Sequence, residues 1–92
     1  MKVKSNDRVV LGWTRDEECV NHTRSLRSSQ GNLWSYNQLI GITADSGQKI
    51  VFDYTAKGEA FISQTTSTHV GRASRYADQC MNIQAAKLGG LL

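Results

Sequence analysis

Residues 65–69, which read Thr-Thr-Ser-Thr-His, place hydroxyl groups and an imidazole where a helix is expected to begin. Hydroxyl side chains cap the first turn of a helix, and the free backbone N–H groups there attract anions. Arg72 would lie about one turn further along and add a positive charge. The pattern predicts a site for a phosphate or a partner's carboxylate, and the simpler alternative is that the hydroxyls only cap the helix.

Arginines extend this candidate surface. Arg72 and Arg75 are three positions apart, so on a helix they would share one solvent-facing side. A polar strand nearby carries two more arginines, which are secondary candidates. The candidate binding residues are therefore Thr66, Ser67, His69, Arg72, Arg75, Arg24 and Arg27. Trp34 and Tyr36 could stack on bases, but their alternation along the chain favours a place in the core.

The cysteines and histidines have the side chains of a zinc site, and Cys19 and His22 have a Cys-x2-His spacing. On the single long helix expected for the C-terminal part, His69 and Cys80 would be about 16 Å apart along the axis. That separation is too large for one ion. We therefore expect no metal site, and we interpret Cys80 as a small core residue.

No side chain is marked as a nucleophile by its neighbours. The sequence contains neither the Gly-x-Ser-x-Gly turn of hydrolases nor the Gly-x4-Gly-Lys loop of nucleotide-binding enzymes. Acidic residues cluster only at positions 16–18, where a helix cap would use them. We expect a protein without enzymatic activity and without a cofactor.

Length and charge set further limits. The chain has 92 residues, enough for one domain with a modest core. Eleven Lys and Arg against 8 Asp and Glu give a net charge of +3, which is mildly basic. No apolar run is long enough to cross a membrane, and residues 1–7 lack the apolar stretch of a secretory signal. Two cysteines are few for a small secreted domain, so we expect free thiols in the cytoplasm.

The hydrophobic pattern changes from period two to helical spacing along the chain. It predicts strands at residues 8–13, 33–43, 49–54 and 60–63, an edge strand at 23–27, a short helix at 14–20 and a main helix at 67–81, extending as far as residue 87. Turns are expected at residues 28–32, 44–47 and 56–59. The expected fold is α+β: a small antiparallel β-meander with one main C-terminal helix packed on one face. Residues 1–92 form a single domain, with 1–7 flexible and 88–92 frayed.

Two segments resemble a family of small accessory proteins encoded by bacteriophages. Residues 33–41 read Leu-Trp-Ser-Tyr-Asn-Gln-Leu-Ile-Gly, and residues 62–69 read Ile-Ser-Gln-Thr-Thr-Ser-Thr-His. In the family, a Leu-aromatic-Ser-Tyr-Asn-x-Leu-Ile-Ala strand precedes a Ser-x-Thr-Thr-Ser-x-His helix start. The resemblance spans residues 33–75, departs from the pattern at Gly41, and does not include residues 1–30.

The resemblance implies an origin rather than a mechanism. Proteins of this kind act in the cytoplasm of the host bacterium by binding a host component in a fixed ratio. We therefore expect a binding protein that inhibits or sequesters a host macromolecule or defence component, in host takeover or counter-defence. The alternative is a small module that binds nucleic acid or a nucleotide phosphate. A homodimer through an edge strand at residues 23–27 is left open, and no membrane contact is expected.

Overall fold

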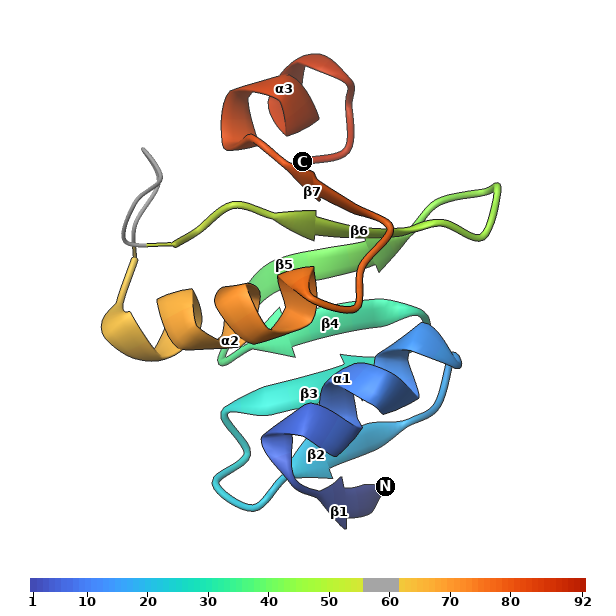
Figure 1. Cartoon of the computed structure of the whole chain (residues 1–92), viewed down its shortest axis with the longest axis vertical. Helices are drawn as coiled ribbons and strands as arrows, with labels where there is room; N and C mark the ends of the chain where they lie inside the picture. The colour runs from blue at the N-terminus through green and yellow to red at the C-terminus, as the bar shows by residue number, and fades with distance from the viewer. Residues whose placement is uncertain (56–61) are drawn as a thin grey trace.

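The protein has an α+β fold, seen in a computed structural model that describes residues 1–55 and 62–92. Within these residues, seven strands form one sheet in which each strand lies beside its neighbours in sequence (Figure 1). The strands are β1 (Lys2–Lys4), β2 (Cys19–Asn21), β3 (Leu26–Ser29), β4 (Asn32–Ser35), β5 (Gln38–Thr43), β6 (Lys49–Phe52) and β7 (Gln79–Met81). The inner pairs are antiparallel, whereas β1 with β2 and β6 with β7 are parallel.

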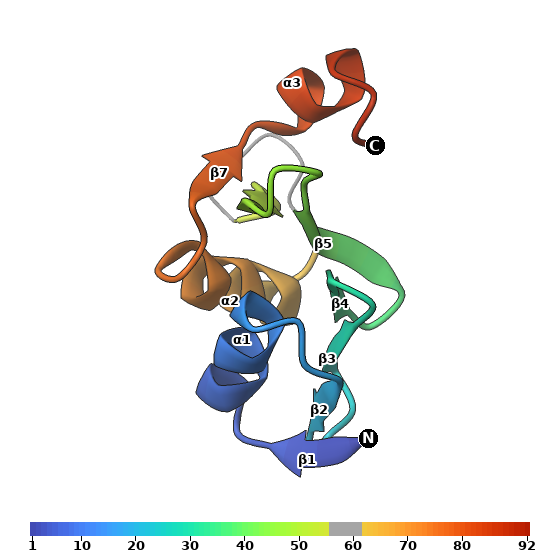
Figure 2. The same ribbon diagram turned by 90° about the vertical axis from the view of Figure 1, so that its right-hand side faces the viewer.

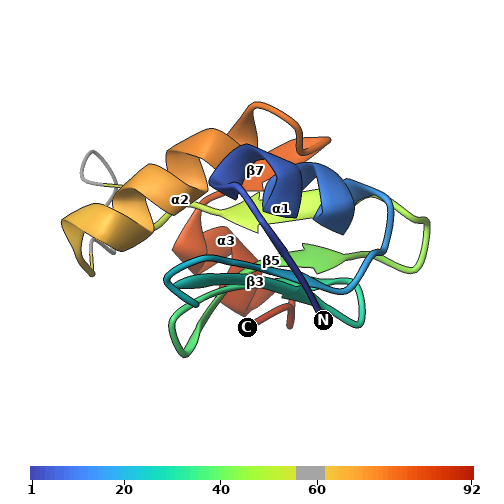
Figure 3. The ribbon, with the colours of Figure 1, turned by 90° about the horizontal axis from the view of Figure 1, so that it is seen from below.

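Each parallel pair is joined through a helix, because two parallel strands need a crossover connection. Helix α1 (Asn6–Thr14) joins β1 to β2, and helix α2 (Gln64–Ser74) lies between β6 and β7. The two helices lie side by side on one face of the sheet (Figure 3). A third helix, α3 (Ile83–Leu88), follows β7 and lies at the far end of the molecule from α1 (Figure 2).

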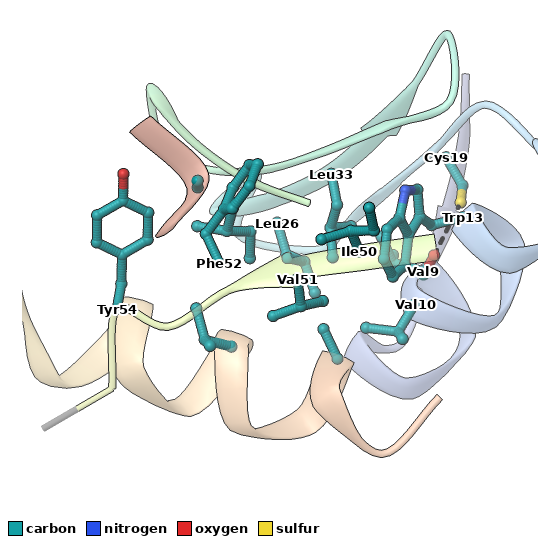
Figure 4. Close-up of a cluster of buried hydrophobic side chains, with 14 residues drawn as sticks. Val9, Val10, Trp13, Cys19, Leu26, Leu33, Ile50, Val51, Phe52 and Tyr54 are labelled. Carbon is teal, nitrogen blue, oxygen red and sulfur yellow. Dashed lines mark hydrogen bonds between the residues drawn. The ribbon is translucent and has the colours of Figure 1, made fainter. Parts of the chain in front are cut away.

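The core fills the space between the sheet and the helices (Figure 4). In the close-up, Val51 of β6 points toward the helices and Phe52 points to the other side of the strand. The fully buried side chains include Val9, Val10, Trp13, Leu26, Leu33, Ile40, Phe52 and Val70. The sequence pattern predicts a buried Phe52, and the structure confirms it.

Residues 8–13 were expected to form a strand, and that prediction is wrong. They belong to α1, whose first turn is capped by the hydroxyl of Ser5 accepting a hydrogen bond from the backbone N–H of Arg8. Val9, Val10 and Trp13 then fall on one side of the helix and are fully buried. An apolar run this short does not show whether its hydrophobic period is that of a helix or that of a strand.

The short helix expected at residues 14–20 is also wrong, because α1 ends at Thr14 and residues 19–21 form β2. Residues 1–7 hold the edge strand β1 and the start of α1. The polar strand expected at the sheet edge, residues 23–27, is instead a turn followed by β3. Since β3 pairs with both β2 and β4, it is not an edge and cannot pair with a second copy.

The strand expected over residues 33–43 is two strands, β4 and β5, joined by a turn at Tyr36 and Asn37. Tyr36 has a φ of 53°, a left-handed conformation that ends the extended chain. The alternation therefore does not continue through the turn. Trp34 is half-buried, and the side chain of Tyr36 is 57% exposed rather than in the core.

The return strand expected at residues 49–54 is confirmed as β6, which is shorter than expected. The turn at residues 44–47 is present, with the N–H of Gly47 donating to the carbonyl of Ala44. Gly47 has a φ of 90°, which only glycine adopts without strain. The turn expected at 56–59 and residues 60 and 61 of the last expected strand lie outside the described residues. Residues 62 and 63 are not in a strand.

The main helix is shorter than the spacing predicts. It ends at Ser74, and the chain then forms β7 and α3, with Gly89 at the C-cap of α3. Cys80 therefore lies on an exposed edge strand and not on the core side of a helix. Both cysteines are free thiols, and Cys19 is buried. Of the residues at helical spacing, Val70 and Ala73 lie in α2, Ala77 lies in the bend after it and Cys80 lies in β7, so the pattern crosses the end of the helix.

Candidate functional site

A polar cleft of about 480 Å³ opens beside the N-terminal half of α2. Its other walls are the start of α1, the end of β2 with the turn after it, and the turn between β4 and β5, all on the left side of the molecule in Figure 1. The lining residues are Asn6, Asn21, His22, Thr23, Ser25, Tyr36, Gln64, Thr65, Thr68 and His69.

In the part of the chain that the structure describes, the lining of this cleft is uncharged and rich in hydrogen-bonding groups. It offers carboxamides, hydroxyls, two imidazoles and one phenol, and none of its ten residues is Asp, Glu, Lys or Arg. Groups of this kind both donate and accept hydrogen bonds. A neutral polar ligand fits this lining better than an anion or a cation, because a charge would find no countercharge there.

Asn21 fixes the floor of the cleft. Its amide nitrogen donates to Oδ1 of Asn6 at 2.8 Å and to Oγ of Ser25 at 2.9 Å. Its carbonyl oxygen accepts from the backbone N–H of Leu26 at 3.1 Å. Both Asn21 and Ser25 are buried, so these bonds hold the turn after β2 against the start of α1. The hydrogen-bonding groups at the floor of the cleft therefore have their partners, and these bonds make the floor rigid.

His69 forms the deepest polar contact of the cleft. Its side chain is buried, with the residue 2% exposed, and Nδ1 lies 2.7 Å from Oγ of Ser35. The same Ser35 oxygen lies 3.0 Å from Oγ1 of Thr66, so three buried side chains form one chain of hydrogen bonds. Among the described residues, Nε2 of His69 has no hydrogen-bond partner.

Burial is the main cause that lowers the pKa of His69 below its ordinary value of 6.5, and the positive charge of Arg72 lowers it further. The imidazole is therefore neutral at pH 7. A neutral imidazole carries one hydrogen, on either ring nitrogen, and uses the other nitrogen as an acceptor. With Nδ1 bonded to Ser35, the Nε2 atom remains for the cleft.

Helical spacing places these groups. Ser63 caps α2 by accepting a hydrogen bond from the backbone N–H of Thr66 at 3.1 Å. From there the buried positions of the helix are Thr66, His69, Val70 and Ala73. The first two meet β4 at Ser35 and the last two meet the apolar core. One helix face thus changes from polar to apolar along its length.

Of the residues expected from the helix start, Thr66 and His69 come together in this buried chain, and Ser67 is half-buried. The hydroxyl of Ser63, rather than a ligand, takes the N–H of Thr66. Arg72 donates to a carboxylate oxygen of Asp7 at 2.5 Å, and its buried Nε has no hydrogen-bond partner among the described residues.

The other arginines lie apart from each other. Arg75 is exposed at the C-cap of α2, and Arg24 occupies the turn after β2 with a φ of 60°. The guanidinium of Arg27 lies 5.6 Å from the ring centre of Trp34, its partner on β4. None of the four arginines lines the cleft, so the structure does not gather them into one surface there.

Sequence reasoning missed Asn21, Ser25 and Ser35. Ser35 carried a signal, because it shares the side of its strand with the apolar Leu33, and both are fully buried. A serine on the buried side of a strand needs a hydrogen-bond partner, and it points to another buried polar group. Asn21 carried no such signal, because nothing local marks the turn that it stabilises.

Three broader findings complete the description. In residues 1–55 and 62–92, no three His, Cys, Asp or Glu side chains group as metal ligands would. The helices of that part of the chain are too short and too polar to span a membrane. Comparison of the chain with protein-family models, with curated proteins and with solved structures finds no match.

Proposed function

We propose that this chain is a non-enzymatic binding protein that holds a partner protein through the polar cleft. The observation that carries the proposal is the Nε2 atom of His69. It belongs to a residue that is only 2% exposed, and it has no partner among the described residues. This atom can form a hydrogen bond with a group that enters the cleft, and a bound partner would supply such a group.

The geometry of Ser35 supports binding rather than catalysis. A Ser–His pair can act as nucleophile and base only when the hydroxyl is open to a substrate. Ser35 is fully buried, and its oxygen already contacts both His69 and Thr66. No carboxylate that could orient His69 is among the residues that line the cleft. These groups act by position and hydrogen bonding.

The partner class follows from charge. Affinity for nucleic acids depends mainly on cationic side chains that contact phosphates, and none of the described residues that line the cleft is Lys or Arg. A protein surface needs no such cations. The resemblance to bacteriophage accessory proteins supports a host protein as the partner. In this proposal the chain acts in the bacterial cytoplasm and inhibits or sequesters a host enzyme or defence complex.

A second candidate function rests on a different face. Alternation along β3 and β4 places Arg27 and Trp34 on the side of the sheet opposite to Leu26 and Leu33. A cation stacked on an aromatic ring is also found where proteins bind single-stranded nucleic acid. This face supports the alternative of a nucleic-acid-binding module.

Native mass spectrometry of the tagged chain recovered from a bacterial lysate, with and without nuclease, tests the proposal. Thr65→Trp would fill the cleft, because Thr65 is an exposed lining residue of α2. Ser74→Trp is the matched control, since Ser74 is exposed on the same helix and does not line the cleft. We expect a nuclease-resistant protein partner with the wild type and Ser74→Trp, and loss of that partner with Thr65→Trp.

Three outcomes would contradict this proposal. A partner that Thr65→Trp retains as well as the wild type does would show that the cleft is not the binding site. Retention of nucleic acid alone, lost after nuclease, would favour the second candidate function. Recovery of the bare chain or of a homodimer alone would contradict sequestration of a protein in that bacterium.

A further inference from the structure

We infer that His69 presents an Nε2–H group to the cleft as a neutral hydrogen-bond donor, and that the cleft accepts an uncharged amide carbonyl of the partner. The ligand class rests on the proposed function, because it assumes that the partner is a protein. The position of the hydrogen does not rest on it, because it follows from the hydrogen bonds inside the chain.

Two directions are available to the hydrogen bonds among Thr66, Ser35 and His69. In the first direction, Thr66 donates to Ser35 and Ser35 donates to Nδ1, so the ring hydrogen is on Nε2. In the second, Nδ1–H donates to Ser35 and Ser35 donates to Thr66. A third arrangement, in which Thr66 and Nδ1–H both donate to the Ser35 oxygen, would leave the hydroxyl hydrogen of the fully buried Ser35 without an acceptor among the described residues, so it is set aside.

The hydroxyl hydrogen of Thr66 decides between the two directions. Thr66 is 2% exposed, and the oxygen of Ser35 is the one hydrogen-bond partner of its hydroxyl among the described residues. The second direction would therefore leave a buried hydroxyl hydrogen without an acceptor. The first direction uses both hydroxyl hydrogens and places the ring hydrogen on the nitrogen that faces the cleft.

The charged imidazolium meets the same difficulty. It carries a hydrogen on both nitrogens, so Nδ1 would donate to Ser35, and the hydroxyl hydrogen of either Thr66 or Ser35 would be left without an acceptor among the described residues. Burial and the nearby Arg72 also lower the pKa of His69 and oppose the positive charge. The neutral ring with Nε2–H is the form that the site stabilises.

A donor at Nε2 requires an acceptor on the ligand, and the lining restricts which acceptor. A carboxylate or phosphate oxygen would find no Lys or Arg among the lining residues that the structure describes. A neutral carbonyl oxygen has no such cost. The side chains of Gln64 and Thr65, on the same helix, have no hydrogen-bond partner in the described part of the chain and offer acceptors for an amide N–H.

Histidine-selective ¹⁵N NMR at pH 7.5 tests both statements. The ring nitrogens report the tautomer of His69 before any ligand is added, and exposed His22 provides a second ring in the same spectrum. Acetamide then serves as the probe, with acetate as its charged isostere and uracil as a base of comparable polarity. We expect the Nε2–H tautomer, and a response to acetamide about tenfold larger than to acetate at equal concentration.

Ser35→Ala is the variant control, because it removes the donor to Nδ1 and should leave a mixture of tautomers. An Nδ1–H tautomer or an imidazolium in the wild type would overturn the assignment of the donor. An equal or larger response to acetate or uracil, or none to acetamide, would overturn the ligand class. The lysate experiment does not depend on the tautomer of His69 or on small probes. The proposed function can therefore fail while the Nε2–H tautomer is confirmed, and the tautomer can be wrong while the proposed function is confirmed.

Discussion

The two crossovers at the ends of the sheet have the same topology and different buried faces. Both β1–α1–β2 and β6–α2–β7 join two parallel strands through a helix on the same side of the sheet. Helix α1 buries Val9, Val10 and Trp13. Helix α2 buries Thr66 and His69 in its first half and apolar residues only after them.

Stability alone explains the first helix and not the second. The one polar atom of the Trp13 side chain, Nε1, donates to the carbonyl of Gly31 at 2.9 Å, so this side chain leaves no polar atom unsatisfied. Two apolar side chains in place of Thr66 and His69 would fill the space between α2 and β4 equally well and would need no hydrogen bonds. The polar pair instead leaves one ring nitrogen facing a cleft. In the proposed function, α1 serves folding and the start of α2 serves recognition.

The largest effect is expected at the apolar helix. Trp13→Ala should reduce the free energy of unfolding by about 3–5 kcal/mol, because it removes a fully buried ring and leaves a cavity. The packing around the ring is tight, since a Cβ on Gly41 would come within 2.8 Å of Cζ2 of Trp13. Urea unfolding followed by circular dichroism measures the loss.

Phe52→Ala is the comparison variant, because Phe52 is also fully buried but belongs to β6. We expect a loss of the same size, about 3–5 kcal/mol. A stable, unshifted unfolding curve for Trp13→Ala would mean that α1 is not the apolar anchor of its end of the sheet, and the contrast between the helices would disappear.

A smaller effect is expected at the polar helix. Ser35→Ala leaves His69 Nδ1 and the Thr66 hydroxyl without their partner, which should cost about 1–3 kcal/mol. It should also weaken binding of the partner. Ser74→Ala is the control, since Ser74 is exposed, and it should change the unfolding free energy by less than about 0.5 kcal/mol.

If Ser35→Ala loses stability but binds the partner as well as the wild type does, the hydrogen bonds among Thr66, Ser35 and His69 serve folding alone. Unfolding and partner binding therefore have to be measured on the same variant. A double variant with Thr66→Val sharpens the result, because two members of one hydrogen-bond chain should not have additive effects.

The pH dependence follows from His69. Its pKa is lower in the folded protein than the ordinary 6.5, so the unfolded chain binds a proton first as the pH falls. The stabilisation is complete above about pH 6.5 and is lost as the pH falls below that value. Arg72 on the same helix acts on the ring electrostatically, and the other titratable side chains among the described lining residues of the cleft are His22 and Tyr36.

Urea unfolding at several pH values between about 7.5 and 5.5 measures this loss, and the range stays above the ordinary pKa of carboxyl groups. His69→Gln should flatten the dependence in that range. A wild-type stability that does not change from pH 7.5 to 5.5 would mean that the folded ring accepts a proton as easily as the unfolded one.

The smallest effect is expected at Arg75. Arg75→Glu should change the unfolding free energy by less than about 0.5 kcal/mol, because Arg75 is exposed. It should leave partner binding intact, since Arg75 does not line the cleft. The arginine surface inferred from the sequence makes the opposite prediction, so loss of binding in this variant would favour that surface over the cleft.

The sequence predicts the α+β fold, β6 and the turn at Gly47 because period-two alternation and a glycine at a positive φ are local signals. It misplaces α1, since the five apolar and small residues from Val9 to Trp13 fit a strand or a helix equally well. It also joins β4 to β5, because the left-handed turn at Tyr36 uses no glycine or proline. The helical form of residues 8–13 and the turn at Tyr36 depend on the tertiary structure and not on neighbouring residues.

The candidate site divides in the same way. His69 and Thr66 stand out as unusual residues at a helix start, and the structure brings them together. Their partner Ser35 is 31 positions before Thr66, and the contact depends on how α2 lies on the sheet. The arginines stand out by charge, but charge alone does not determine which face they share.

Hydrogen–deuterium exchange of the purified complex, compared with the free chain, tests most directly whether the partner occupies the cleft. The account predicts new protection in the turn after β2, in the turn between β4 and β5, and in the first half of α2, because these segments line the cleft. Protection confined to Arg27 and Trp34 on the other side of the sheet, with the cleft segments unchanged, would contradict it.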